Sequence, residues 1–293
     1  PGISLKQEGI SYACGCQLPA VIINMVRGGP GLGNIAPSQS DYFQSAKGGG
    51  HGDYRMIVLM PSNVQEIVEL TMLAFDLADK YRNPVLILGD GWIGQMMEPV
   101  DFDNLPKPNV FPKDSWALTG CKGRPSRIIR SLFLAEGILE KWNFMLMKKY
   151  NEMELNEVRY EEFMTKDADW IIVAYGTSSR VCRETIEMAR EKGIKAGMLR
   201  PITAWPFPYA PLRKLADSCK GFLAVEMSGG QMVEDVLIGT TGKKPIWFYG
   251  RMGGGVPDTN SILNILEKIN KGSEPKDKFM EYERGIWRTL VPR

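Results

Sequence analysis

Near the start of the chain, a cation is followed by closely spaced glycines. Arg27 ends a mainly apolar run at 20–26 and opens the sequence RGGPGLG at 27–33. Glycines let the backbone approach a ligand closely, and a guanidinium can hold a carboxylate or a phosphate through two parallel hydrogen bonds. The same residues could also form a surface turn with a solvated arginine. The loop alone leaves both interpretations open.

The elements around this loop place it at the edge of a sheet where ligands bind. Residues 20–26 are almost continuously apolar, which is typical of a parallel strand buried on both faces. A short helix capped by Ser38 or Ser40 is predicted at 37–43. Strands are predicted at 55–60 and 84–88, joined by a helix at 62–81 that Ser62 caps, with Gln65 placed for a capping box. Ligands of open α/β sheets bind at the carboxyl ends of the strands, and Arg27 is expected there.

The second half of the chain predicts a separate α/β domain. Its strands are expected at 170–174, 195–199, 222–226 and 245–249, with helices between them. The expected division is a first domain at 1–127, a helical connector at 128–164 and a second domain at 165–293. The charged tail from Asn270 could be an arm that docks on a partner subunit.

Several other motifs give weaker evidence of a binding or catalytic role. Gly31-x-Gly33-x-x-Ala36 matches a dinucleotide fingerprint, but Pro37 follows at once and no long helix opens there. The sequence GTSSR from Gly176 could cradle a phosphate, but capping of a helix explains the same residues at no extra cost and is the favoured interpretation. The acid and glycines from Glu226 to Gln231 could bind a ligand, or they could have a structural or interface role. His51 lies in a glycine-rich loop and has no visible catalytic partner.

Composition excludes several classes of function. The chain has 293 residues and a net charge of +2, without a basic run, so binding to nucleic acid is not expected. No apolar run approaches the roughly 20 residues that span a bilayer, and no leader sequence is visible, which predicts a cytoplasmic protein. Five scattered cysteines fit neither a disulfide framework nor a metal or iron–sulfur site in this chain.

Eight stretches in order resemble the α subunit of the 2-oxoacid:ferredoxin oxidoreductases, and the branched-chain (2-ketoisovalerate, or 3-methyl-2-oxobutanoate) type most of all. They are PGISLKQEG at 1–9, NMVRGGPGLGNIAPSQSDYFQ at 24–44, KGGGHGDYR at 47–55, YRNPVLILGDG at 81–91, GQMMEPV at 94–100, VAYGTSSR at 173–180, LRPITAWPFP at 199–208 and VEMSGGQMVEDV at 225–236. Only the connection at 101–125 and the tail lie outside the resemblance.

The resemblance implies a fold and a set of cofactors. The first domain would be a parallel sheet of the thiamine-diphosphate pyrimidine-binding type, and the second would resemble the transketolase C-terminal domain. A β subunit would share thiamine diphosphate and carry Mg²⁺, while [4Fe–4S] centres would lie in partner subunits. The expected partners are β and γ subunits, a δ ferredoxin-like subunit in some members, ferredoxin and a small 2-oxoacid, with coenzyme A as co-substrate. Such enzymes are known from anaerobic metabolism.

The resemblance also assigns roles to single residues. Arg27 matches the arginine that binds the substrate carboxylate, with Gly28 and Leu32 in the same loop, and Gly2 and Ile3 match the cofactor-binding region. The 2-oxoglutarate-type members read RxGPSTG here, whereas this chain has Gly31 and Leu32 in place of Ser-Thr. That change removes hydroxyl donors and adds an apolar side chain, which favours aliphatic 2-oxoacids.

One departure concerns the start of the chain. The glutamate by which the family activates the cofactor precedes the stretch that begins here at Pro1. We therefore expect an N-terminally truncated sequence without a catalytic residue of its own, and inactive alone. Three alternatives stay open: a non-catalytic assembly module, a 2-oxoglutarate-type member, and the transketolase-like β subunit of a 2-oxoacid dehydrogenase, which the two glycine loops disfavour.

Overall fold

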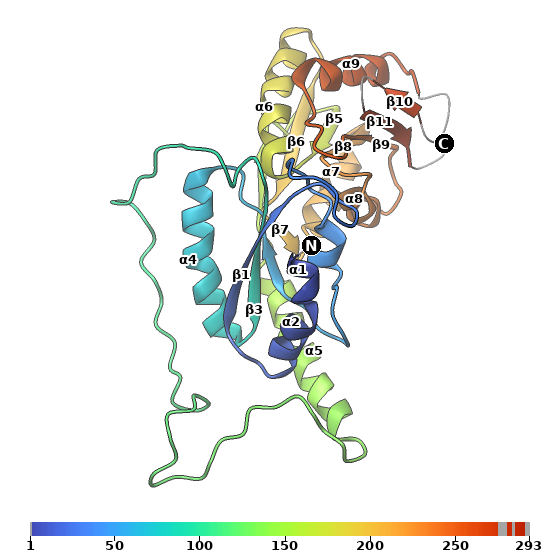
Figure 1. Ribbon diagram of the computed structural model, residues 1–293. Coiled ribbons are helices and arrows are strands. Elements are labelled where there is room, and N and C mark those ends of the chain that lie inside the picture. The colour runs from blue at the N-terminus through green and yellow to red at the C-terminus, as the bar shows by residue number, and fades with distance from the viewer. Residues whose placement is uncertain (1, 275–279, 283–284, 291–293) are drawn as a thin grey trace.

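The structure, a computed structural model, describes residues 2–274, 280–282 and 285–290. Pro1 and the remaining tail residues lie outside this range. The described residues form two sheets flanked by helices, and most of the segment between β3 and α5 is a long loop that passes outside α4 (Figure 1). No helix in this part of the chain is both long enough and apolar enough to cross a bilayer.

The first sheet has the strand order β1-β3-β2-β7. Its predicted strands are β1 (Ala20–Val26), β2 (Ile57–Leu59) and β3 (Pro84–Asp90), and they are parallel as expected. The register pairs Val26 with Asp90, so both strands end at the same edge and Arg27 follows directly. The fourth strand, β7 (Thr203–Trp205), comes from the second half of the chain and runs antiparallel to β2.

Four helices belong to this half: α1 (Gly2–Leu5), α2 (Gln7–Gly15), α3 (Tyr42–Ala46) and α4 (Val64–Tyr81). The predicted cap of α4 was wrong by one residue. The Asn63 side chain accepts from the Glu66 amide at 2.8 Å, and the Glu66 carboxylate accepts from the Ser62 amide, also at 2.8 Å. Asn63 and Glu66 thus take the roles expected of Ser62 and Gln65. Ser62 was the more obvious cap in sequence, but the extended backbone falls at Asn63.

The prediction for residues 37–43 also needs correction. We expected a helix capped by Ser38 or Ser40, but α3 begins only at Tyr42, after Asp41. Ser38 and Ser40 instead bond to each other at 3.0 Å, and Ser38 also donates to the carbonyl of Met227 at 3.1 Å. The serines follow this pattern because the segment before α3 packs against the second domain.

The second sheet has seven strands in the order β10-β11-β9-β8-β5-β6-β4. Its four predicted strands form the parallel centre: β5 (Trp170–Val173), β6 (Ala196–Pro201), β8 (Gly221–Glu226) and β9 (Ile246–Gly250). The antiparallel edges are β4 (Tyr160–Phe163), β10 (Met280–Tyr282) and β11 (Gly285–Thr289). The helices are α5 (Ile138–Asn156), α6 (Gly176–Glu191), α7 (Tyr209–Ser218), α8 (Met232–Thr240) and α9 (Thr259–Asn270).

Two expectations about this half were therefore wrong. The connector is helical only over α5, and residues 160–163 form an edge strand because they pair with β6. In the described part of the tail, β11 pairs with β9 and buries Trp287, so this part completes its own sheet rather than reaching out as an arm. The limits of 127 and 164 between the expected domains stay a prediction.

Successive side chains of β5 belong to two different hydrophobic clusters of the core. Ile172 faces a cluster that includes α6 and α9, whereas Ile171 and Val173 face a cluster that continues into the first domain through α7 and α8. Successive side chains of a strand point to opposite faces, so both faces of a buried central strand must be apolar. The apolar run at 170–173 reflects this arrangement, and it fixes the second sheet against the first domain.

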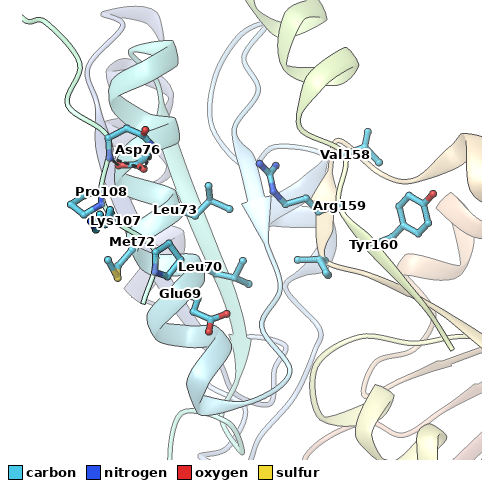
Figure 2. Close-up of a pocket in the computed structure, with 13 residues that line it drawn as sticks. Glu69, Leu70, Met72, Leu73, Asp76, Lys107, Pro108, Val158, Arg159 and Tyr160 are labelled. Carbon is cyan, nitrogen blue, oxygen red and sulfur yellow. Dashed lines mark hydrogen bonds between the residues drawn. The ribbon is translucent and has the colours of Figure 1, made fainter. Parts of the chain in front are cut away.

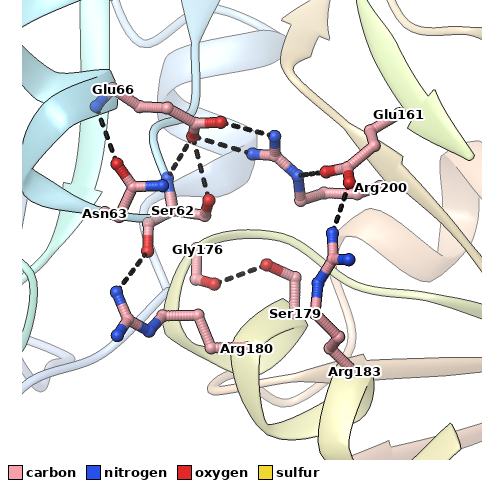
Figure 3. Close-up of polar contacts among 9 residues, drawn as sticks. All are labelled: Ser62, Asn63, Glu66, Glu161, Gly176, Ser179, Arg180, Arg183 and Arg200. Atoms are coloured by element: carbon pink, nitrogen blue, oxygen red, sulfur yellow. Dashed lines mark hydrogen bonds and ion pairs between the residues drawn. The ribbon is translucent and has the colours of Figure 1, made fainter. Parts of the chain in front are cut away.

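An ion-pair cluster also joins the domains (Figure 3). Arg200 on β6 forms two bonds with the Glu66 carboxylate, at 2.9 and 2.6 Å, and its Nε bonds to Glu161 at 2.8 Å. Arg183 pairs with Glu161 as well, and Arg180 reaches Glu98 at 2.7 Å. Each arginine thus has a carboxylate partner, and Glu66 links α4 of the first domain to the second sheet.

Candidate functional site

A cleft of about 1000 Å³ lies where the two domains meet. Its walls come from the loop after β1, the segment before α3, the loop after β8, the loop after β9 and the start of α1. All five residues that the sequence singled out line it: Gly2, Ile3, Arg27, Gly28 and Leu32. The structure therefore brings together residues from both ends of the first domain's opening segment.

Arg27 is half-buried at this cleft and bonds only to neutral backbone oxygens. Its Nη1 donates to the carbonyl of Asn34 at 2.7 Å, to Gly28 at 3.3 Å and to Leu32. Within the described residues, no carboxylate pairs with this guanidinium. A cation held by its own loop, with no counter-charge, is suited to receive an anion.

Hydrogen bonds across the domain boundary hold the base of the cleft together. Gln231 of the second domain donates from Nε2 to the carbonyl of Ser40 at 2.7 Å and accepts from the amide of Phe43, also at 2.7 Å. The amide of Gln39 bonds to the carbonyl of Met227 at 2.9 Å. These bonds hold the segment before α3 against the loop after β8, so the cleft has a fixed base.

Gln39 is the centre of this contact, and it is 2% exposed. Its side-chain oxygen accepts from Met227 N at 2.9 Å and from Ser178 Oγ at 3.1 Å, while Nε2 donates to Tyr175 O at 2.9 Å and to Asp90 at 3.3 Å. All donor and acceptor positions of the amide are therefore used. A fully bonded buried amide favours one arrangement of the two domains.

Two motifs that the sequence left open have structural roles. The N-terminus of α6 at Gly176–Ser179 faces the carboxylate of Asp90, not a phosphate, because Thr177 donates to it from its amide and its hydroxyl at 2.9 and 2.7 Å. Glu226 is fully buried and accepts from Ser228 Oγ and from the amides of Gln231, Met232 and Val233. Burial raises the pKa of Glu226, against the effect of these four donors. Its carboxylate caps α8.

Several polar cleft residues were not predicted, among them Asn24 and Asp41. Asn24 lies inside the apolar strand β1 and donates from Nδ2 to the carboxylate of Asp41 at 3.1 Å. Both line the cleft, along with Ser38, Ser40 and Gln231. The available signal was a single polar residue within the run AVIINMV. By contrast, His51 is exposed and does not line the cleft, and the loop around it is fixed by Tyr54, whose hydroxyl accepts from the amides of Gly49 and Gly50.

Two other hollows on the molecule contain arginines that pair with glutamates. The groove in Figure 2 lies between α4, residues 106–109 and the start of β4, and its Arg159 forms an ion pair with Glu157 at 2.8 Å. The hollow over the ion-pair cluster of Figure 3 contains three arginines that all pair with glutamates. Among the described residues, no group of three or more His, Cys, Asp or Glu side chains is arranged to hold a metal ion.

Comparisons with known proteins match both halves of the chain. The family model "Pyruvate flavodoxin/ferredoxin oxidoreductase, thiamine diP-bdg" matches residues 1–156, and "Pyruvate:ferredoxin oxidoreductase core domain II" matches residues 168–262. The chain is 51% identical to the ketoisovalerate oxidoreductase subunit VorB of Methanothermobacter marburgensis, over 92% of this chain and 76% of that protein. It is 34% identical to the 2-oxoglutarate synthase subunit KorA of Methanothermobacter thermautotrophicus, over 92% and 79%.

A solved structure shows the same fold. The 2-oxoglutarate:ferredoxin oxidoreductase of Magnetococcus marinus, with 2-oxoglutarate, coenzyme A and succinyl-CoA bound, superposes with a TM-score of 0.78 at 24% identity. The match covers 92% of this chain and 51% of that one, so this chain spans about half its length. The expected α/β fold of two sheets and the family resemblance are both confirmed. The chain belongs to the thiamine-diphosphate-binding family of 2-oxoacid:ferredoxin oxidoreductase subunits.

Proposed function

We propose that this chain is the substrate-binding subunit of an enzyme that oxidatively decarboxylates a branched-chain 2-oxoacid. The observation that carries the proposal is the half-buried Arg27, held by backbone carbonyls at the cleft and paired with no carboxylate among the described residues. A 2-oxoacid supplies the missing anion. Its carboxylate would bind the guanidinium, which orients the 2-oxo carbon in the cleft.

The apolar lining of the cleft supports an aliphatic substrate. Five side chains supply it: Ile3, Met25, Pro30, Leu32 and Met252. Met25 packs against Gly89 and Gly94, where an added Cβ would come within 2.6 and 3.2 Å of its sulfur. A branched chain can pack against such a lining, whereas the distal carboxylate of 2-oxoglutarate would need a further cation. The higher identity to the ketoisovalerate relative than to the 2-oxoglutarate relative supports the same choice.

We propose that thiamine diphosphate binds in the same cleft. A Cβ added at Gly2 would meet no atom within 4 Å, and the neighbouring Ile3 offers an apolar contact for an aromatic ring. We propose that Gly2 and Ile3 hold the pyrimidine end. When bound, the cofactor supplies the nucleophilic carbon and the electron sink of the decarboxylation. The chain's own residues bind the substrate carboxylate, orient the chain and limit the access of water.

The remaining components would come from partners. We propose a β subunit that shares the cofactor and binds Mg²⁺, a γ subunit, in some complexes a δ ferredoxin-like subunit, and [4Fe–4S] centres in these subunits that pass electrons to ferredoxin. Coenzyme A would take the acyl group. The proposed division of this chain is 1–127, 128–164 and 165–293, in a cytoplasmic complex.

Turnover by the assembled complex tests this proposal. The full-length chain and its partner subunits would be combined with thiamine diphosphate, Mg²⁺, coenzyme A and 2-ketoisovalerate, and the reduction of ferredoxin followed. Reduction that depends on the 2-oxoacid supports the enzyme. Stable assembly without turnover would support the alternative, a non-catalytic assembly module.

A further inference from the structure

The loop that carries Arg27 has one tightly constrained conformation. Arg27 and Pro37 form an antiparallel bridge, the amide of Gly28 bonds to the carbonyl of Ala36 at 2.8 Å, and the amide of Asn34 bonds to the carbonyl of Gly28 at 3.0 Å. Gly33 has φ +54°, and a Cβ there would lie 1.9 Å from the Gly28 oxygen. The loop therefore closes on itself as a rigid unit.

The side chain of Asn34 connects this unit to the second domain. Its Oδ1 accepts from the amide of Ala36 at 3.1 Å, and its Nδ2 donates to the carbonyl of Gly253, in the loop after β9, at 2.9 Å. The backbone oxygen of Asn34 accepts from Arg27 Nη1 at 2.7 Å. A single residue thus touches the loop, the guanidinium and the other domain.

A second contact shows how closely the two loops approach. Gly254 has φ +95°, and a Cβ added there would lie 2.3 Å from the Cβ of Ala36. Only glycine allows this approach without a shift of one loop. Gly253 and its neighbour Met252 line the cleft opposite the Arg27 loop, so the spacing of the loops sets the width of the cleft at Arg27.

We infer that Asn34 is a positioning residue for the substrate carboxylate. Its amide ties the Arg27 loop to the loop after β9 and so fixes the carbonyls that hold the Arg27 guanidinium. Loss of the amide lets this loop shift as a unit relative to the loop after β9, and the Arg27 guanidinium then no longer has one position in the cleft. This inference rests on the proposed binding of a 2-oxoacid carboxylate by Arg27.

The test uses two variants in the assembled complex. Asn34→Ala removes both side-chain bonds, whereas Asn34→Asp keeps the acceptor for Ala36 but places a carboxylate oxygen against the Gly253 carbonyl. Both variants lose the link to Gly253, so both should raise KM for 2-ketoisovalerate about 2- to 10-fold, the factor that one net hydrogen bond supports. We expect kcat to change less than about twofold, because the reacting atoms are not touched. Asn104→Ala is the control, since it removes an exposed side-chain bond to Asp101 far from the cleft.

A double-mutant cycle separates positioning from a general structural effect. Asn34→Ala should raise KM in the wild type but have no further effect on KM in an Arg27→Ala background, because it acts through Arg27. An equal effect in both backgrounds would overturn the inference, as would a wild-type KM in both Asn34 variants while Arg27→Ala raises it. If Arg27→Ala itself leaves KM unchanged, the proposed function fails, whatever the Asn34 variants do.

Discussion

Asp90, the last residue of β3, and Thr177, in the first turn of α6, join the two domains of this chain. The carboxylate accepts from both the amide and the hydroxyl of Thr177, at 2.9 and 2.7 Å, and Asp90 is 2% exposed. A carboxylate at a helix N-terminus is favoured by the helix dipole as well as by the hydrogen bonds. Because β3 ends beside β1, this contact also fixes the edge from which Arg27 projects.

Replacing Asp90 should therefore destabilise the whole chain. In Asp90→Asn, an NH2 group replaces one of the two carboxylate oxygens. The donors that faced that oxygen lose their acceptor, and we expect the free energy of unfolding to fall by about 1.5–3 kcal/mol. Urea denaturation of the two proteins measures it. Thr177→Val should cost about 1 kcal/mol and Thr177→Ser less, because serine keeps both donors. Equal stability of Asp90→Asn and the wild type would show that the contact contributes nothing.

The ion pair between Glu66 and Arg200 should contribute more to the stability of the fold than the neighbouring ion pairs do. Arg200 is 5% exposed and Glu66 is 22% exposed, so the pair is only partly shielded from water. We expect Arg200→Met to cost about 2–3 kcal/mol, below the roughly 3–5 kcal/mol of a fully buried pair. The more exposed Arg183 forms a matched control, and Arg183→Met should cost about 1 kcal/mol or less. The prediction fails if thermal and urea unfolding rank the two variants the other way.

Leu32 should influence the choice of substrate. The side chain is 84% exposed at the mouth of the cleft, so a change there should leave stability nearly unaltered. Leu32→Thr should lower kcat/KM for 2-ketoisovalerate relative to 2-oxoglutarate by about 10-fold, since one lost apolar contact is worth roughly 1–3 kcal/mol. Ile35→Ala, in the same loop but outside the cleft lining, is the control. A wild-type enzyme that prefers 2-oxoglutarate would contradict the proposed substrate class.

Glu157 should make stability depend on pH. Burial of this carboxyl opposes its ionisation, but hydrogen bonds from Lys80, Tyr81 and Arg159 outweigh burial and lower its pKa. The pKa is thus lower in the folded chain than in the unfolded one. The resulting stabilisation is complete above the unfolded value of about 4.3 and is lost as the pH falls through the folded value.

The measurement compares wild type with Glu157→Gln. The free energy of unfolding of the wild type should fall more steeply as the pH drops below about 5, so that the two proteins converge in acid. Glu152→Gln, at an exposed position near the end of α5, should follow the wild-type curve. Parallel curves for the wild type and Glu157→Gln would rule out this role of the carboxyl.

The sequence predicted the parts of the fold that depend on local pattern. Continuous apolar runs identified β1, β3 and the four central strands of the second sheet, because strands buried on both faces must be apolar throughout. It missed β4, β7 and β11, which are strands only because a partner from elsewhere in the chain pairs with them. The cap of α4 and the start of α3 were misplaced because tertiary contacts, not propensity, decided them.

The sequence also predicted only part of the candidate site. Arg27 and its glycines were visible because cation and glycine spacing is a local signal. Asn24, Asp41, Gln39 and Asn34 were missed as a set, since their roles arise only where the two domains meet. The convergence of Gly2, Ile3 and Leu32 on the cleft with Arg27 could be proposed by resemblance, but their assigned roles stay predictions.

The central claim is that Arg27 binds the carboxylate of a 2-oxoacid, and one measurement tests it most directly. The assembled complex is compared as wild type, Arg27→Lys and Arg27→Ala, with initial rates of ferredoxin reduction recorded over a range of 2-ketoisovalerate concentrations. A charge-assisted pair of about 1.5–3 kcal/mol predicts that Arg27→Ala raises KM about 10- to 150-fold, with Arg27→Lys in between. An Arg27→Ala complex that assembles, turns over and keeps the wild-type KM would contradict the claim.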